Sequence, residues 1–330
     1  MALTRRPLIE HREFRICQSF GLPKSERHSG GKMKKILECV PNFSEGRDSD
    51  KIERIVNPFR GRKKVKLLDY QRDEDHNRMV VTAVGEPESL RCAVMEAMGI
   101  ATECIDMRLH RGQHPRMGAT DVIPFIPIRN IGMAEAAEVA GSFARQAAEK
   151  YQIPVFLYEK SASSPHRENL SNIRKGQFEG MAEKMRLPQW KPDFGPETIH
   201  PGAGVTAVGA RMPLVAFNVN LNTDNPDVAS AIAKKVRHIS GGLRYCKGIG
   251  VELRERGIVQ ISMNMTDFSK TSLYAAFELV SMEAKRHGLS VTGSEIVGLV
   301  PMAALTDAAA YYLRLENFST EQVLEAKITE

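Results

Sequence analysis

The chain of 330 residues has few cysteines and no long apolar run. Its five cysteines, an odd number, lie far apart, and none stands in a Cys-x-x-Cys pair. This usage argues against a disulfide framework and a cysteine zinc site, and it favours reduced thiols in a cytoplasmic protein. No apolar stretch approaches the roughly twenty residues needed to cross a bilayer, so we expect no association with a membrane.

The sequence also lacks the glycine-rich motifs that bind nucleotide phosphates, Gly-x-Gly-x-x-Gly after a strand and Gly-x4-Gly-Lys-Ser/Thr. Its net charge of +6 is concentrated at one end, because residues 1–32 hold seven Lys/Arg against three Asp/Glu. The remainder is close to neutral, so the charge does not indicate nucleic-acid binding. Residues 1–32 have no apolar signal-peptide core, and we expect a disordered N-terminal extension.

From residue 33 onward the hydrophobic pattern alternates between strand and helix periods. Residues 33–213 and residues 214–330 each show the order β-α-β-β-α-β with extra elements, which we interpret as two subdomains. The order predicts an α+β fold of two ferredoxin-like (βαββαβ) subdomains with antiparallel or mixed sheets and helices on one face. Adjacent strands without an intervening helix argue against a doubly wound parallel sheet.

The expected elements follow from the same pattern, and residues 161–212 between the halves are interpreted as a connector rich in Gly, Pro, Ser and charge. Helices are expected over 50–59, 87–104, 133–151, 226–240, 270–287 and 302–315. Strands are expected over 35–40, 65–70, 79–84, 121–128, 153–158, 214–221, 248–253, 258–263 and 289–293.

The segment 110–128 places two histidines and two arginines directly before an apolar run. Gly112 and Pro115 disfavour a helix there, so the segment predicts a basic loop at the end of a buried strand. Histidine is suited to proton transfer near neutral pH, and the residues alone leave His110 and His114 as equal candidates. Their four-residue spacing also fits helical zinc ligands, but Gly112 and the absence of a His-Glu-x-x-His motif lead us to expect no metal.

Seven short segments, in order along the chain, resemble the formiminotransferase family. They cover essentially everything from Met33 to the C-terminal helix. The segments are LECVPNFSEGRD (37–48), LLD followed by NR (67–78), HPRMG (114–118), PDFGP (192–196), GVTAVGAR (204–211), AFNVNL (216–221) and GLVP (298–301).

The resemblance implies that the protein converts N-formimino-L-glutamate and tetrahydrofolate, its co-substrate, into 5-formimidoyltetrahydrofolate and glutamate. This reaction belongs to histidine degradation and one-carbon metabolism. The expected partners are small-molecule substrates, a second copy in a homodimer, and a separate cyclodeaminase that receives the product; no metal or nucleotide is expected. Two alternatives stay open: a formyl-transferring 5-formyltetrahydrofolate/glutamate salvage enzyme, and a non-catalytic folate-binding protein.

Within the matching motifs, the resemblance assigns the general acid/base to His114. In animal relatives an acid two residues after the equivalent of Asp69 belongs to the active site, but this chain has Gln71 there. Asp73 and Asp75, in the acidic loop that follows, are the candidates for a carboxylate that stabilises the imidazolium. A solvated turn between two strands is the alternative for this loop.

The donor's two carboxylates call for arginine, whose guanidinium binds a carboxylate through two hydrogen bonds, and the candidates are Arg78, Arg116 and Arg211. The segment 195–204 resembles the family's folate-contacting loop, and its small residues let the backbone approach a flat pterin closely. A glycine-rich connector is the alternative. The expected folate-binding residues are Gly195, Pro196, Glu197, Thr198, Ile199, His200, Pro201, Gly202, Ala203 and Gly204.

Overall fold

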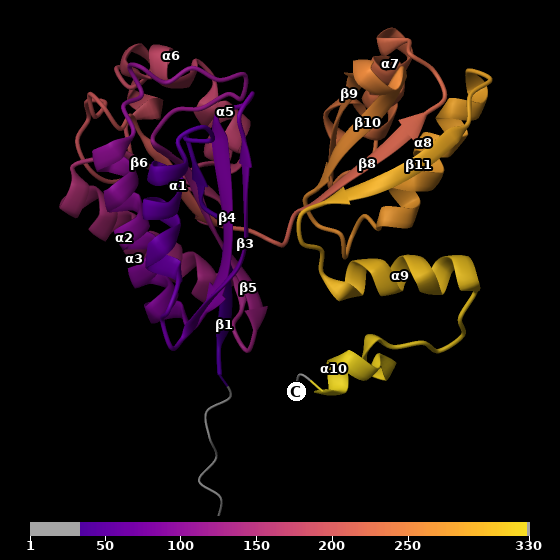
Figure 1. The fold of residues 1–330 in the computed structure, drawn as a ribbon, viewed down its shortest axis with the longest axis horizontal. Helices are drawn as coiled ribbons and strands as arrows, with labels where there is room; N and C mark the ends of the chain where they lie inside the picture. The colour runs from indigo at the N-terminus through magenta and orange to yellow at the C-terminus, as the bar shows by residue number, and fades with distance from the viewer. Residues whose placement is uncertain (1–33, 329–330) are drawn as a thin grey trace, which may run out of the picture. The chain divides into compact units, whose positions relative to one another are not determined.

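The computed structural model describes residues 34–328 and organises them around two β-sheets (Figure 1). Residues 1–33, which include the predicted N-terminal extension, and residues 329–330 lie outside the described part. The first sheet uses strands between residues 36 and 210, and the second uses strands between residues 215 and 297. Sheets of this kind together with many helices confirm the predicted α+β class.

The first sheet has seven strands in the order β1-β4-β2-β5-β7-β6, and β3 pairs with β4. β1 to β5 pair antiparallel, whereas β7 runs parallel to both β5 and β6, so the sheet is mixed. The strands are β1 (Ile36–Cys39), β2 (Asn42–Phe43), β3 (Val65–Asp73), β4 (Arg78–Gly85), β5 (Thr120–Arg129), β6 (Val155–Glu159) and β7 (Thr206–Ala210).

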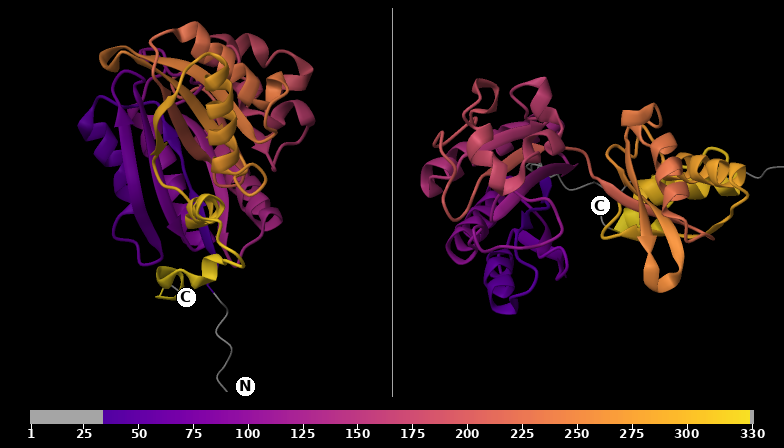
Figure 2. Two further views of the ribbon diagram at one scale, coloured as in Figure 1. Left: turned by 90° about the vertical axis from the view of Figure 1, so that its right-hand side faces the viewer. Right: turned by 90° about the horizontal axis from the view of Figure 1, so that it is seen from above.

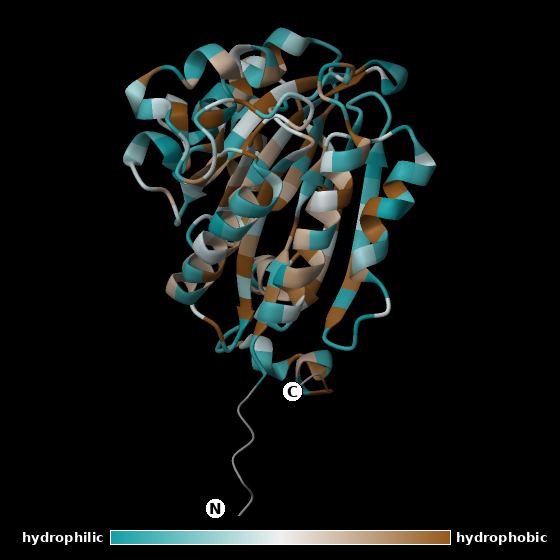
Figure 3. Cartoon of the chain, turned by 90° about the vertical axis from the view of Figure 1, so that its left-hand side faces the viewer, coloured by the Kyte–Doolittle hydropathy of each residue, from teal (hydrophilic) through white to brown (hydrophobic). Residues whose placement is uncertain are grey.

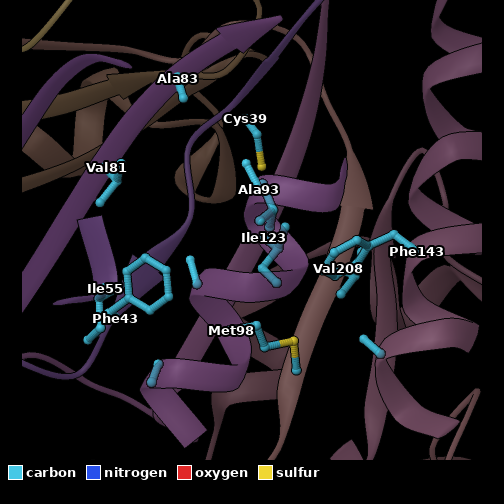
Figure 4. Close-up of a cluster of buried hydrophobic side chains, with 14 of the residues drawn as sticks. Cys39, Phe43, Ile55, Val81, Ala83, Ala93, Met98, Ile123, Phe143 and Val208 are labelled. Atoms are coloured by element: carbon cyan, nitrogen blue, oxygen red, sulfur yellow. The ribbon is translucent and has the colours of Figure 1, made fainter. Parts of the chain in front are cut away.

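Three helices, α1 (Ser49–Val56), α2 (Pro87–Cys104) and α3 (Met133–Tyr151), cover one face of this sheet (Figures 1 and 3). α2 and α3 have the predicted bounds, because Pro87 occupies the first helical turn and Gln152 ends α3 in the left-handed conformation. The buried stripes of both helices are rich in alanine, which lets them approach the strands closely. Figure 4 shows part of the resulting core, in which Phe43, Ile123 and Phe143 come from a short strand, a long strand and a helix.

Short helices cover the opposite face at the β5-β7-β6 end of the sheet. Ile173 of α5 (Leu170–Arg174) and Met181 of α6 (Gln177–Lys184) pack there with Val122 and Phe156. In the first sheet, the expectation of helices on one face therefore holds for α1 to α3 only. The cause is that β5 is buried on both faces, as its nearly continuous apolar sequence requires.

The predicted connector 161–212 contains more structure than expected. It forms α4 (Pro165–Glu168), α5, α6 and a 3-10 turn, and it ends in the fully buried strand β7. The sequence TAVGA of β7 has small side chains, and a Cβ at Gly209 would collide with the carbonyl oxygen of Tyr158. Because small residues also occur in linkers, the pattern did not distinguish a tightly packed strand from a loop.

The second sheet has four antiparallel strands in the order β11-β8-β10-β9. Two helices pack against it and against each other (Figure 2). Their apolar side chains enclose a second core. The elements are β8 (Val215–Leu221), α7 (Pro226–Val236), β9 (Cys246–Leu253), β10 (Ile258–Met265), α8 (Leu273–Arg286) and β11 (Val291–Val297).

Element ends in this half differ from the predictions for local reasons. α7 ends at Val236 before a 3-10 turn, and α8 begins after Ser272, whose hydroxyl accepts a hydrogen bond from the Ala275 amide. β11 extends to Val297 because it pairs with β8 along most of its length. Two further helices follow, α9 (Met302–Leu313) and α10 (Leu324–Ile328). Among residues 34–328, no helix is both long and apolar enough to cross a membrane.

Candidate active site

The histidine loop joins α2 to β5 and lines a narrow, partly open pocket. As predicted, residues 110–118 contain no helix, and the buried strand starts at Thr120. Segments far apart in the sequence meet at this pocket, from the β2 region, the β3–β4 turn, the histidine loop and β5. The lining residues are Phe43, Ser44, His76, Asn77, Arg78, His110, His114, Arg116 and Asp121.

The β3–β4 turn is tightly fixed at the pocket. The strands end at Asp73 and resume at Arg78, so the predicted charged loop is a short turn between paired residues. Asn77, with a φ of 47°, accepts a hydrogen bond from Gly46 N–H (2.9 Å) and donates one to the Arg111 carbonyl (3.0 Å). A Cβ at Gly112 would collide with the His76 carbonyl oxygen, so only glycine permits this contact between turn and histidine loop.

His110 is a fully bonded, buried residue. Its Nδ1 accepts a hydrogen bond from Arg116 Nε (3.2 Å), which leaves Nε2–H to donate to the Asn77 carbonyl (2.8 Å). Burial lowers the pKa of His110, although the hydrogen bond to the Asn77 carbonyl opposes that shift. Both ring nitrogens are therefore committed to holding the loop in place.

His114 differs from His110 in having an uncommitted nitrogen. Its Nδ1 is buried without a hydrogen-bond partner among the described residues. Burial, followed by the positive charges of Arg78 and Arg174, lowers the pKa of His114 to about 3. The ring is therefore unprotonated at neutral pH and has a free nitrogen beside the pocket.

Asp73 is paired with His76, a lining residue of the pocket. Asp73 Oδ1 accepts the His76 backbone N–H (2.7 Å), and Oδ2 lies 2.7 Å from Nδ1 of the same imidazole. Burial would raise the pKa of Asp73, but its hydrogen bonds to His76 outweigh that effect and lower it. The His76 ring meets the His114 ring edge-on, with centroids 6.1 Å apart.

The other acidic residues of the turn lie differently. Asp75 is exposed and is not a lining residue; its backbone carbonyl accepts a hydrogen bond from Gln113 N–H (3.2 Å). Gln71 donates its side-chain amide to Asp69 Oδ2 (3.0 Å). Of the two predicted carboxylates, Asp73 is therefore the one placed next to a pocket histidine.

Arg78 is a half-buried cation without a carboxylate bonded to it. Its guanidinium bonds the Asn42 side-chain oxygen, and its buried Nε has no partner among residues 34–328. Burial lowers the pKa of Arg78 to about 10, and the charge of Asp121 only partly offsets this. The pocket thus contains a positive group whose hydrogen-bonding capacity is not filled.

Arg116 and Arg211 are already bonded. Arg116 lines the pocket, but its two terminal nitrogens bond Glu179 at 2.7 and 2.8 Å. Arg211 is not a lining residue; it follows β7 and donates to the Met212 carbonyl (2.9 Å).

Arg174 and Asp121, which are not among the predicted site residues, form an ion pair at the pocket. Arg174 Nη2 lies 2.5 Å from Asp121 Oδ2, and the other oxygen of Asp121 accepts the Met117 N–H at 2.9 Å. Arg174 ends a short helix in the region interpreted as a connector. No sequence signal links it to a residue 53 positions earlier, so only the fold shows this contact.

The segment 195–204 lies directly beside the histidine loop. Gly118 and Gly204 form a β-bridge, and a Cβ on either would collide with the backbone of the other segment. The Ala203 amide donates to His200 Nδ1 (2.8 Å), and the Gly202 carbonyl accepts the Met107 N–H (2.7 Å). The sequence-predicted folate loop and the HPRMG motif are thus brought together.

The PDFGP motif anchors the start of this segment. Asp193 Oδ2 lies 2.8 Å from Arg167 Nη1 and also accepts the Leu157 N–H at 2.7 Å. Both members of the ion pair are nearly inaccessible, with side-chain exposures of 8% and 9%. Removing either one would leave the other charge buried without a partner, so Asp193 gives the motif a role in stabilising the fold.

Metal-binding groups are not found in the described part of the chain, where no cluster of three His, Cys, Asp or Glu side chains has suitable geometry. The pocket gathers arginines around His110 and His114, whose pKa values are both lowered. This arrangement is typical of a site that binds anionic small molecules and transfers protons.

Comparison with known proteins identifies the family. Residues 36–211 match the formiminotransferase domain, N-terminal subdomain, and residues 216–329 match the formiminotransferase domain. The chain belongs to the formiminotransferase family.

Several relatives are similar over most of this chain. It is 53% identical to a glutamate formimidoyltransferase of Streptococcus pyogenes serotype M1 over 89% of this chain and 98% of that protein. A glutamate formimidoyltransferase of Thermoplasma acidophilum is 44% identical over 89% of this chain and 97% of its own. The formimidoyltransferase-cyclodeaminase of Rattus norvegicus is 42% identical over 86% of this chain, which corresponds to 54% of that protein.

Proposed function

We propose that this protein transfers the formimino group of N-formimino-L-glutamate to tetrahydrofolate, giving 5-formimidoyltetrahydrofolate and glutamate. The observation that supports this most strongly is the 53% identity to a glutamate formimidoyltransferase, which spans 98% of that relative. The pocket agrees with it, since the donor is anionic and the reaction requires proton transfer rather than redox chemistry.

The reaction needs one proton to change place. The N5 amine of tetrahydrofolate attacks the formimino carbon, forming a C–N bond and a tetrahedral intermediate. The attacking nitrogen then loses a proton, and the glutamate nitrogen gains one as its C–N bond breaks. We assign this transfer to His114, because it has a free ring nitrogen at the pocket whereas His110 has none.

Substrate binding itself would prepare His114. In the structure its pKa is about 3, because of burial and then the positive charges of Arg78 and Arg174. A donor carboxylate bound to Arg78 would neutralise part of that charge and so raise the pKa of His114 toward the range useful for catalysis. The unfilled donors of Arg78 make it the first candidate for this contact.

The other substrate assignments remain part of the proposal. Arg116 would bind a carboxylate by exchanging it for the exposed Glu179, and Arg211 would act from the end of β7. Residues 195–204 would hold the pterin, since their backbone lies against the HPRMG motif. Tetrahydrofolate is a co-substrate here, and the formimino carbon would sit between it and His114.

We also propose that both halves are ferredoxin-like subdomains divided near Pro213. The strand order supports this. When the strands of the second half, β8 to β11, are counted along the chain, they lie side by side in the sheet as the fourth, first, third and second strand. β1–β2, β3, β4 and β5 follow the same order, and β7 and β6 extend the sheet beyond β5. We further propose that the protein is a homodimer in the cytoplasm and that a separate cyclodeaminase receives its product. Some relatives are named formimidoyltransferase-cyclodeaminase, which joins the two activities in one name.

The direct test of the site is replacement of His114. A His114→Gln variant should lower kcat by roughly 10²–10⁴, the usual contribution of general acid–base catalysis, with small changes in the KM for tetrahydrofolate. The matched control is His110→Gln, which should cost less than about tenfold in kcat and act mainly on stability. Near-normal turnover by the His114 variant, or equal loss in both, would contradict the assignment.

A further inference from the structure

The surroundings of His114 destabilise its protonated ring, and a second histidine, His76, lies next to it. A proton taken from the attacking amine would reside on a ring surrounded by Arg78, Arg174 and His76. The exposed imidazole of His76, in contrast, has a carboxylate on one side and the pocket on the other. The two rings are edge to face, 6.1 Å between centroids.

The geometry of His76 gives it a defined tautomer. The carboxylate of Asp73 accepts hydrogen bonds from the backbone N–H and from Nδ1 of His76, both at 2.7 Å. A carboxylate can only accept, so Nδ1 of His76 carries the hydrogen and Nε2 has the free lone pair. No hydrogen bond involves Nε2 within the described residues. Each ring therefore has one unoccupied nitrogen, Nδ1 on His114 and Nε2 on His76, and both rings line the same pocket.

We propose that His76, backed by Asp73, holds the proton in transit. This relay rests on the proposed function. His114 accepts the proton from the attacking nitrogen and passes it to Nε2 of His76, directly or through one water. The resulting imidazolium forms an ion pair with Asp73. The same proton then returns through His114 to the departing glutamate nitrogen, so no proton is gained or lost.

The structure places His76 well for this task. A Cβ at Gly112 would strike the His76 carbonyl, and Asn77 bonds both Gly46 and Arg111, so the turn is fixed against two neighbouring segments. The charged and titratable groups facing His76 are those of the pocket and of its own turn. They are Asp73, Glu74, Asp75, Arg78, His110, His114, Arg116 and Asp121, with Arg174 behind His114.

Substitution separates the relay from a structural role. His76→Gln keeps polarity and approximate size but cannot take up a proton, and it should lower kcat by about 10–100-fold while leaving both KM values nearly unchanged. Asp73→Asn should give a smaller loss and move the acid limb of the kcat–pH profile to lower pH, because the imidazolium loses its carboxylate. Glu74→Gln is the matched control: an exposed neighbour whose carboxylate pairs with Arg72, and which should behave as the wild type.

Rescue of a His76 variant by added imidazole distinguishes a proton relay from a structural role, because imidazole would not restore activity lost through a structural change. The His76 side chain is 46% exposed, so imidazole from solution can enter the space left in a His76→Ala variant. Added imidazole should restore part of kcat in that variant and should leave the wild-type-like turnover of Glu74→Gln unchanged. A loss that is not rescued, or one that appears in KM alone, would overturn the relay.

An NMR titration of the unliganded protein tests the pairing without turnover. Because a proton held on His76 disfavours protonation of the neighbouring His114, His76→Gln should let the His114 ring protonate at higher pH than in the wild type. Wild-type turnover with formimino-glutamate tests the proposed function separately. If the wild type turns over, and His76→Gln matches it in kcat and in the His114 titration, the relay is wrong and the proposed function stands.

Discussion

Two histidines four residues apart in the same loop have opposite roles because of what surrounds them. His110 uses both ring nitrogens to join Arg116 to the Asn77 carbonyl. His114 keeps Nδ1 free in a positively charged pocket. Sequence spacing could not separate them; the family resemblance indicated His114, and the hydrogen bonds supply a physical reason for that preference.

The depressed pKa of His114 has a consequence for stability. The folded protein keeps the ring unprotonated down to about pH 3, whereas the unfolded chain takes up that proton near pH 6.5. Between these values the unfolded state binds more protons, so the free energy of unfolding falls as pH falls. The full contribution is present above pH 6.5 and decreases through the acid range.

We therefore expect His114→Gln to weaken the acid dependence of stability. Between pH 7 and pH 5 the wild type should lose up to about 2 kcal/mol more than the variant, from the proton uptake of this one group. Urea denaturation of both proteins at the two pH values measures the difference. Identical losses would mean that His114 is protonated in the folded state.

Residue-level chemistry that depends on distant contacts could not be predicted. Asp121 was expected only as the start of a strand, and Arg174 only as part of a connector, yet they are 2.5 Å apart. Asp73 was one of two equivalent acids in a loop until the strands were seen to pair as far as Asp73 and Arg78. Ion pairs of this kind arise from the fold and leave no local pattern.

At the scale of elements, predictability followed the strength of the local signal. α2 and α3 match their predicted bounds because each is long, periodic and clearly ended. β7 was missed because its five small residues, with glycine among them, resemble a linker. Its position between β5 and β6 is fixed by tertiary packing, which overrides weak intrinsic preference.

The contact between the histidine loop and residues 195–204 depends on two glycines. A Cβ at Gly118 would collide with the Val205 carbonyl oxygen, and backbone cannot move aside as a side chain can. Gly118→Ala should therefore cost more than about 2 kcal/mol in unfolding free energy and reduce turnover by disturbing the site.

The control for this substitution lies in α3. Gly141 is inside the helix with open space where its Cβ would be, so Gly141→Ala should raise the free energy of unfolding by about 0.5–1 kcal/mol. Thermal and chemical denaturation of the two variants give the comparison. A tolerated Gly118→Ala would show that the two segments separate easily.

At the scale of the whole molecule, two sheets with separate cores explain why the sequence pattern repeats. The buried clusters on the two faces of the first sheet use β1 to β7 and the helices near them in sequence, and the cluster of the second sheet uses β8 to β11 and theirs. The order of elements was therefore predictable from periodicity. The mixed direction of the first sheet and the helices on its second face depend on the inserted region 161–212.

The central claim is that this chain transfers the formimino group of N-formimino-L-glutamate to tetrahydrofolate. The most direct measurement supplies the purified full-length protein with tetrahydrofolate and either N-formimino-L-glutamate or N-formyl-L-glutamate, and follows glutamate release and the folate product. We predict rapid release of glutamate with the formimino donor, formation of 5-formimidoyltetrahydrofolate, and no change when a chelator is added. Folate binding without glutamate release, or turnover with the formyl donor alone, would contradict the account.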